Sequence, residues 1–310
     1  LFNNRLRMTA DYYRKKTTDL LNNVEMPRSS GYTTALRNIG SIRNSGFELQ
    51  LDGRIIDRAV KWDLGVNFSL NRSKVLVLSE DKDIFGGELD NTILKDQLNL
   101  MRVGEPMYVF YGYVEDGYDE NGHIVYKNMD DDPAITAADK TIIGDPNPDF
   151  LVNLTTAVSY KGFTLSAFFQ SSIGNDIYSL SMAAQAYDYG YNGNTLREVY
   201  YNHWTPENPT AKYPNLDQTS YKMSDRFVYD GSFVRLKNLE LAYDVPCARN
   251  KFIKRARVYV SAQNLFTITS YPFWDPDINA NGGGSSMIQG VDSYCYPSAR
   301  TYTIGCRLTF

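Results

Sequence analysis

The last ten residues, Thr301-Tyr302-Thr303-Ile304-Gly305-Cys306-Arg307-Leu308-Thr309-Phe310, alternate strictly between two kinds of side chain. The even-numbered positions are apolar or aromatic, and the odd-numbered positions are polar, charged or glycine. Successive side chains of a β-strand point to opposite faces of the sheet, so a period of two predicts a strand with one apolar and one polar face.

The same alternation recurs along the chain and predicts eight strands. Most are longer than the roughly five or six residues usual in soluble sheets, and they reach the roughly 9–11 residues that a tilted membrane strand needs. In the sixth strand the apolar phase shifts between Leu236 and Leu239, which predicts a bulge near Lys237-Asn238. The predicted strands lie near residues 2–15, 45–56, 60–73, 149–161, 162–173, 226–244, 254–267 and 299–310.

The connections between these strands alternate in length. In chain order they contain about 29, 3, 75, almost no, 52, 9 and 31 residues. A soluble sandwich has no reason to place every long connection at one end of its sheets, whereas an outer-membrane barrel has short periplasmic turns and long extracellular loops. The pattern therefore predicts an all-β, antiparallel transmembrane β-barrel, or part of one.

Aromatic residues fall where the two membrane interfaces would lie, as amphipathic rings prefer. Those at the predicted short-turn ends are Trp62, Tyr160, Phe163, Tyr243 and Phe310, and those at the long-loop ends are Tyr12, Tyr13, Tyr271 and Trp274.

Composition excludes several classes of protein. The chain has 310 residues, a formal net charge of −4 and no run of about 18 apolar residues, so a transmembrane helix is excluded. The near-balanced charge gives no basic patch that would favour nucleic acid. With only two histidines, and with Cys247, Cys295 and Cys306 lacking CxxC spacing, neither a zinc site nor a histidine-based catalytic site is expected.

Five segments, taken in order, resemble the SusC/RagA family of TonB-linked outer-membrane importers. They are Asn38-Ile39-Gly40-Ser41-Ile42-Arg43-Asn44-Ser45-Gly46-Phe47-Glu48, Gly144-Asp145-Pro146-Asn147-Pro148-Asp149-Phe150 before the strand pair that turns at Ser159-Tyr160-Lys161-Gly162, Phe233-Val234-Arg235-Leu236-Lys237-Asn238-Leu239, Val258-Tyr259-Val260-Ser261-Ala262-Gln263-Asn264-Leu265-Phe266 with the following Asp275-Pro276-Asp277, and Tyr296-Pro297-Ser298-Ala299-Arg300-Thr301 with the closing Phe310.

The resemblance implies a fold and a function for the longer protein. Residues 1–310 would supply the last eight or so of about 22 barrel strands, without the N-terminal plug and the earlier strands. The full protein would import a glycan, an oligosaccharide or a peptide, and would not be an enzyme. Its implied partners are a SusD-like surface lipoprotein that closes over the mouth, TonB through the missing N-terminal part, and outer-membrane lipid. We expect a Gram-negative outer membrane with the C-terminus in the periplasm.

Aromatic residues crowd the long connection between residues 174 and 225. Sugar rings stack on aromatic faces, and neighbouring amide and carboxylate groups bond sugar hydroxyls, so these residues are candidates for binding substrate. The alternative is a loop that packs on its own small hydrophobic cluster. The candidates are Tyr187, Tyr189, Tyr191, Tyr201 and Trp204.

An acidic segment, residues 128–139, has oxygen side chains at the spacing of an EF-hand calcium loop. Asn128, Asp130, Asp132 and Asp139 are the candidate ligands. Pro133 stands where that loop has a glycine, and Asp139 is shorter than the usual glutamate. A solvated acidic turn is the alternative, and no other cofactor is expected.

Two functions of other classes remain open on the sequence alone. A soluble or surface-attached carbohydrate-binding module would use the aromatic loops as its platform, and it would require the apolar strand faces to meet in a sandwich core. A surface glycosidase would require two carboxylates about 5–10 Å apart in a cleft. The discriminating observation is whether the apolar positions are covered by protein or form an outward band.

Overall fold

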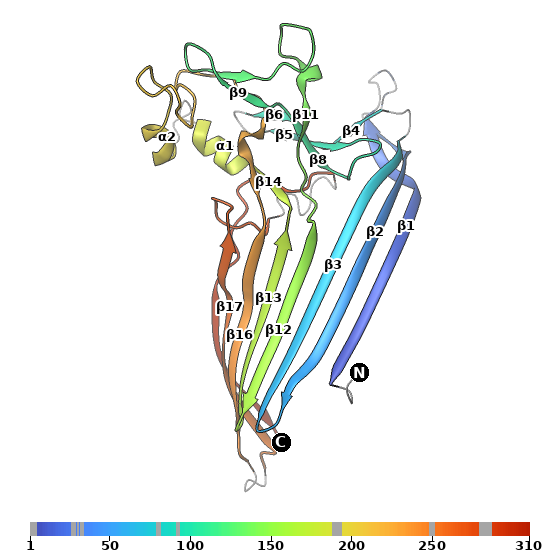
Figure 1. Cartoon of the computed structure of the whole chain (residues 1–310), viewed down its shortest axis with the longest axis vertical. Helices are drawn as coiled ribbons and strands as arrows, with labels where there is room; N and C mark the ends of the chain where they lie inside the picture. The colour runs from blue at the N-terminus through green and yellow to red at the C-terminus, as the bar shows by residue number, and fades with distance from the viewer. Residues whose placement is uncertain are drawn as a thin grey trace.

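The computed structural model describes residues 5–25, 29, 31, 34–78, 82–90, 94–187, 194–247, 252–278 and 287–310. Its main body is an antiparallel sheet of eight strands, and the strands lie side by side in chain order (Figure 1). These strands are β1 (Leu6–Glu25), β2 (Thr34–Asp57), β3 (Val60–Leu78), β12 (Phe150–Tyr160), β13 (Phe163–Ile173), β16 (Phe233–Val245), β17 (Arg255–Thr269) and β19 (Thr301–Thr309).

The connections at one end of the sheet carry the remaining elements, whereas the opposite end has only short links (Figure 1). Residues 79–149 hold β4 (Ile84–Phe85), β5 (Glu88–Asp90), β6 (Lys95–Gln97), β7 (Asn99–Met101), β8 (Val109–Gly112), β9 (Glu115–Tyr118), β10 (Ile124–Tyr126), the 3₁₀ turn η3 (Ala137–Asp139) and β11 (Thr141–Gly144). Residues 174–232 hold β14 (Asp176–Ser179), α1 (Leu180–Tyr187), α2 (Arg197–Tyr201), η5 (Asp225–Phe227) and β15 (Val228–Asp230), and β18 (Val291–Asp292) precedes β19.

The alternating long and short connections are confirmed, but one predicted length was wrong. Residues 26–33 separate β1 from β2, where about 29 residues were expected. Both strands continue far beyond the end of the apolar alternation, because β1 pairs with β2 through the polar stretch around Lys15-Lys16-Thr17. Backbone pairing needs no apolar face once strands leave the hydrocarbon layer, so the sequence pattern ends before the hairpin does.

Short links turn sharply where the backbone permits it. Between β12 and β13 the chain reverses over Lys161 and Gly162, both with positive φ (48° and 84°), which is the twist that a two-residue hairpin favours. The predicted bulge is also confirmed: the pairing of β16 with β17 steps from Leu236 to Asn238 and leaves Lys237 unpaired.

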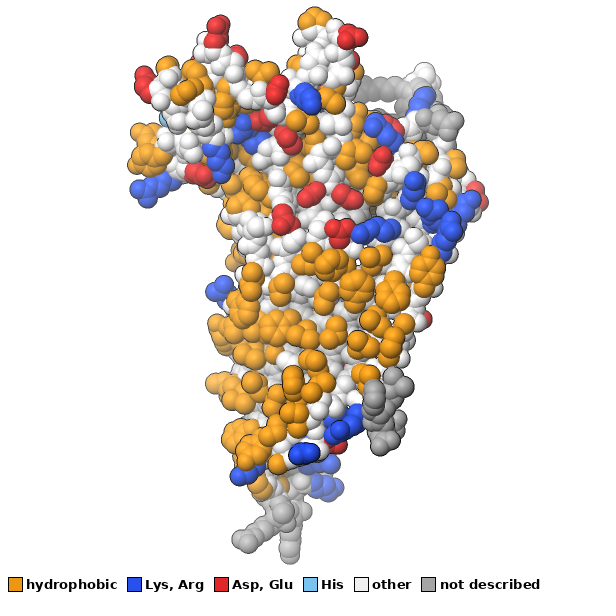
Figure 2. Space-filling model, in the orientation of Figure 1, with side chains coloured by type: hydrophobic (Ala, Val, Ile, Leu, Met, Phe, Trp, Pro, Cys, Tyr) orange, Lys and Arg blue, Asp and Glu red, His pale blue; other side chains and the backbone are white. Residues whose placement is uncertain are grey.

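Strand register places the apolar side chains of different strands in common rows. One row runs from Trp62 through Val158, Leu165, Leu241 and Val260 to Ile304, each the direct partner of the next. Figure 2 shows these rows as a broad apolar band across the sheet. Ile304 is 86% exposed, and among the described residues no second layer packs on the band. A sandwich core of the kind that a soluble module needs is therefore not present in the described part of the chain.

The main hydrophobic core lies in the connections rather than in the sheet. Phe110, Tyr178, Phe227 and Leu98 are completely or almost completely buried there, and α1 packs into the same cluster. This core joins segments from all three longer connections into one assembly above the ends of β12, β13 and β16 (Figure 1). No helix among the described residues has the length and apolar character needed to cross a membrane.

Candidate functional site

The face of the sheet opposite the apolar band is polar across its whole width. One row of directly paired residues crosses seven strands and carries amides, hydroxyls and a guanidinium. In a closed barrel this face lines a wet interior, since apolar and polar side chains alternate between lipid and lumen. The row comprises Thr9, Gln50, Asn67, Asn153, Gln170, Arg235 and Thr267.

Arg235 fixes the last long connection to this polar face. Its guanidinium donates to Thr267 Oγ1 at 2.9 Å and to Ser298 Oγ at 3.2 Å, and it forms ion pairs with Asp275 and, at 3.4 Å, with Asp277. Arg235 is only 1% exposed, so its charge needs this full set of acceptors. Burial tends to raise the pKa of Asp275, but hydrogen bonds from the backbone of Ser298 and Asp277 and from Arg235 hold that pKa below its usual range.

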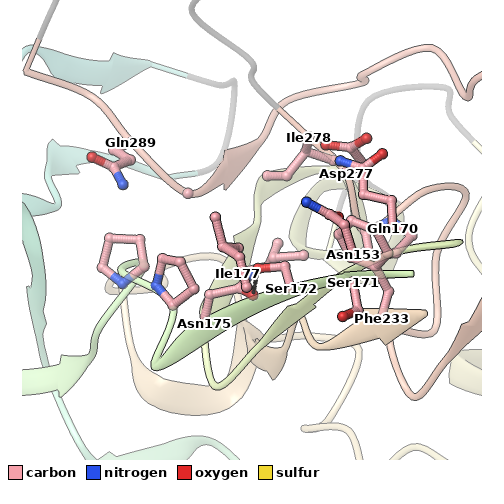
Figure 3. Close-up of a pocket in the computed structure, with 15 residues that line it drawn as sticks. Asn153, Gln170, Ser171, Ser172, Asn175, Ile177, Phe233, Asp277, Ile278 and Gln289 are labelled. Atoms are coloured by element: carbon pink, nitrogen blue, oxygen red, sulfur yellow. Dashed lines mark hydrogen bonds between the residues drawn. The ribbon is translucent and has the colours of Figure 1, made fainter. Parts of the chain in front are cut away.

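A pocket of about 260 Å³ opens where the connections meet the polar face (Figure 3). Its wall combines amide and hydroxyl groups with proline rings and a few apolar side chains, and Asp277 is its one acidic residue. In Figure 3, Asn153 and Gln170 lie together on the sheet, below Asp277 and Ile278 from the last long connection. The lining residues are Pro146, Pro148, Leu151, Asn153, Gln170, Ser171, Ser172, Asn175, Ile177, Phe233, Pro276, Asp277, Ile278, Gln289 and Gly290.

Hydrogen bonding within the described pocket wall leaves one buried acceptor without a partner. Ser171 donates to the carbonyl of Val152 at 2.6 Å, and Ser172 donates to Asn175 Oδ1 at 2.7 Å. Asn153 Oδ1 is buried and has no hydrogen-bond partner among the described residues. A buried acceptor without a hydrogen-bond partner costs free energy.

The aromatic candidates do not form one platform. Tyr187 is 4% exposed, because its ring stacks on Tyr221 at a centroid distance of 3.8 Å and meets Phe227 edge-on. Tyr187 therefore belongs to a loop that packs on its own hydrophobic cluster, and its ring is not accessible to a substrate. Burial raises the pKa of the Tyr187 hydroxyl well above the ordinary value.

The other aromatic candidates differ from Tyr187. Tyr201 is 69% exposed at the end of α2, where its ring meets Tyr200 edge-on. Trp204 is half-buried and packs on the turn between β9 and β10. Its indole ring lies so close to Gly122 that a Cβ added to this glycine would be 2.2 Å from the ring. Tyr189 and Tyr191 lie outside the described residues.

The prediction that Tyr271 lies at the membrane interface was wrong. Tyr271 is buried in the assembly of connections, where its hydroxyl donates to Asp292 at 2.6 Å and accepts from the Ser179 hydroxyl at 2.8 Å. It therefore joins two connections instead of marking the membrane boundary.

The acidic segment is a series of turns closed by its own side chains. Asn128, Asp130 and Asp132 each accept from the backbone N–H two residues on, at 2.8–3.1 Å. Asp139 is fully buried and accepts from the backbone of Met129 and Thr136, both at 2.7 Å, and these bonds lower its pKa. Among the residues that the structure describes, no group of three or more His, Cys, Asp or Glu side chains is arranged to hold a metal ion.

Comparison with known proteins agrees with this geometry. Residues 1–265 match the family model described as "TonB dependent receptor-like, beta-barrel". The chain belongs to the TonB-dependent receptor family. TonB-dependent receptor P3 of Formosa agariphila is 33% identical over the whole chain, and TonB-dependent receptor SusC of Bacteroides thetaiotaomicron is 29% identical over 99% of it. The chain spans about a third of the length of these curated relatives (33% and 30%).

Solved structures of about 28% identity share the fold of this chain. The RagAB peptide importer in its closed-closed state superposes with a TM-score of 0.84 at 28% identity, covering 100% of this chain and 34% of that one. The open-open state gives a TM-score of 0.80. The eight strands are thus a partial, antiparallel barrel of a SusC/RagA-like TonB-dependent receptor, and the family places them in an outer membrane.

Three residues of the site in this receptor barrel were not predicted from the sequence: Asn153, Gln170 and Arg235. A signal was present: Arg235 and Asp275 lie in two of the segments that resemble SusC/RagA, and Asn153 and Gln170 occupy polar positions of alternating strands. What the sequence could not supply was the return of the last long connection, which brings Asp277 to the strand pair that carries Asn153 and Gln170.

Proposed function

We propose that this chain forms wall, rim and extracellular connections of an outer-membrane importer for glycans, oligosaccharides or peptides. One observation carries the proposal: the sheet has a continuous apolar band on one face and a continuous polar row on the other. A sheet with two such faces, closed with further strands, separates lipid from a hydrated passage. The family match and the SusC-like relatives support the same assignment.

The proposed partners rest on the similarity to SusC-like receptors. A SusD-like lipoprotein would sit over the end that carries the long connections, which we take as extracellular. Because β19 follows a long connection, its far end, the C-terminus, would then lie on the periplasmic side. TonB would engage the full-length receptor through an N-terminal part outside residues 1–310. In this proposal the chain is not an enzyme. RagAB is a peptide importer, which supports peptide beside glycan as the cargo class.

The pocket beneath the connections supplies contacts suited to such cargo. Amide and hydroxyl groups exchange hydrogen bonds with sugar hydroxyls or peptide groups, while proline and Phe233 surfaces take apolar portions of the ligand. Apart from Asp277 the wall is uncharged, so the pocket favours neutral polar segments of a substrate.

The test is import by cells that carry the full-length receptor. Cells with and without its gene are given labelled neutral oligosaccharides and labelled peptides of matched size, with and without a proton uncoupler. We expect uncoupler-sensitive uptake of one cargo class only in cells with the receptor. Equal uptake of every cargo in both strains would contradict the proposal.

The soluble module is less well supported. It would place the apolar band in a sandwich core, whereas Ile304 and Tyr302 are among the most exposed side chains of the sheet.

A further inference from the structure

The outward face of β1, β2 and β3 changes abruptly from apolar to basic along the strands. The row Tyr12, Phe47 and Leu70 closes the apolar band on the side of the long connections. The next two rows on the same face contain five cationic side chains: Arg14 and Arg72 flank Ser45 in one row, and Lys16, Arg43 and Lys74 form the other. These five residues are named here the basic cluster.

The residues of the basic cluster share one face because they share one register. Lys16 is the direct partner of Arg43, and Arg43 is the direct partner of Lys74, so three cations stand side by side. Adjacent strands lie about 4.8 Å apart and two residues advance about 7 Å along a strand, so the cluster covers roughly 10 by 7 Å. Figure 2 shows Lys and Arg side chains gathered over this part of β1–β3, directly above the band.

An acidic side chain pairs with only one of the five residues of the basic cluster. Arg72 pairs with Asp149 at 2.6 Å and also donates to the carbonyl of that residue. The side chains of Arg14, Lys16, Arg43 and Lys74 form no ion pair or hydrogen bond with any described residue. Like charges directly opposite one another destabilise a sheet, so the row Lys16, Arg43 and Lys74 would be favoured by a bound polyvalent anion.

The position of the cluster decides which anion it meets. Side chains of the apolar band contact hydrocarbon, so the next rows stand at the depth of the lipid headgroups. Lysine and arginine at that depth attract anionic headgroups, by about 1 kcal/mol each. We propose that the basic cluster binds an anionic, phosphate-bearing lipid headgroup of the membrane that surrounds the barrel. The proposal rests on the membrane placement under the proposed function, but on neither the cargo nor the lid.

The test measures lipid retention by the full-length receptor. Wild-type receptor is placed in phosphatidylcholine nanodiscs that contain a small fraction of bisphosphorylated lipid A, or of the same glycolipid with its phosphates removed, and the retained glycolipid is counted by native mass spectrometry. The variant K16Q/R43Q/K74Q removes one complete row of the cluster. The control R7Q/K15Q/K61Q removes the same three charges from exposed positions on the polar face of β1 and β3.

We expect the wild type and the control to retain the phosphorylated glycolipid and the row variant to bind it at least about tenfold more weakly. Unchanged circular dichroism and melting would establish that all three proteins are folded. Equal retention by the row variant, or equal binding of the dephosphorylated glycolipid, would overturn the proposal.

Two further outcomes would also overturn it. Full competition by inorganic phosphate at equal concentration would indicate a site for a free anion only. Loss of the co-purifying lipoprotein from the row variant, with lipid retention unchanged, would indicate a protein-docking surface. Because import is measured separately, a receptor that imports cargo but fails this test would refute only the lipid site.

Discussion

Arg235 of β16 holds Asp275, forty residues further along the chain, in an ion pair whose two side chains are 2% and 8% exposed. The pair joins the polar face of the sheet to the connection between β17 and β19, beside the pocket that Asp277 and Pro276 line. Because both charges are withdrawn from water, neither is stable without the other.

Arg235→Met should release this connection. Removing one partner of a buried pair typically costs about 3–5 kcal/mol, because the other charge remains buried and unpaired. Hydrogen exchange in residues 270–278 and 287–300 of the full-length receptor should accelerate. Arg54→Met is the control, since Arg54 pairs with Asp63 at an exposed site and its loss should leave the exchange of these residues nearly unchanged. Equal exchange in the two variants would contradict a clamping role.

The same pair predicts a dependence on pH. The pKa of Asp275 is lowered in the folded protein, so the stability it contributes is present above its unfolded pKa of about 3.9 and is lost as pH falls through the folded value. The difference in stability between the wild type and Arg235→Met should therefore shrink below about pH 4. A difference that stays constant from pH 7 to pH 3 would show that Arg235 does not act through an ionised Asp275.

Tyr187 should behave as a core residue of the connections. Tyr187→Ala should cost about 3–5 kcal/mol of local stability, as large aromatic truncations in cores do. Tyr187→Phe should be neutral or slightly stabilising, because the buried Tyr187 hydroxyl has no hydrogen-bond partner among the described residues. Exposed Tyr201→Ala should stay within about 0.5 kcal/mol. Limited proteolysis of the connections would rank the three, and a weaker effect from Tyr187→Ala than from Tyr201→Ala would contradict the packing described here.

Asn153 and its strand partner Asn67 offer a matched pair for testing the pocket. The two lie opposite each other on β12 and β3, yet only Asn153 lines the pocket. Asn153→Leu should weaken binding of imported cargo by about fivefold, the equivalent of one hydrogen bond, while Asn67→Leu should change it less than about twofold. Calorimetric titration of the full-length receptor measures both, and equal effects would remove the pocket from the substrate path.

Strand positions, faces and the bulge at Lys237 were predictable because they depend on local alternation, which the lipid and the lumen impose on each strand. The extent of β1 and β2 was not, because Lys15 to Asp19 are polar on both faces and carry no period. The site was predictable only in part. Tyr187 is buried by Tyr221 and Phe227, and Arg235 pairs with Asp275. Both contacts involve residues of the long connections, whose sequences have no repeating pattern from which such contacts could be predicted.

Asp139 gives a test of the acidic segment. Asp139→Ala should destabilise this turn locally, because the carboxylate caps the turn by accepting from the backbone N–H groups of Thr136 and Met129. We expect the same cost with calcium and with chelator, since the carboxylates of this segment are occupied by backbone N–H groups. A melting temperature of the full-length receptor that falls on chelation and recovers with Ca²⁺ would instead assign a calcium site to residues 128–139.

The order of strands in the sheet is the order of strands in the chain, so each strand hydrogen-bonds only to those before and after it. The backbone pairing of the wall therefore needs no hydrogen bond from the long connections at its upper end. The long connections can be lengthened, shortened or exchanged during evolution while the membrane-embedded strands keep their pairing. Receptors of this architecture can diversify what they recognise without redesigning how they stand in the bilayer.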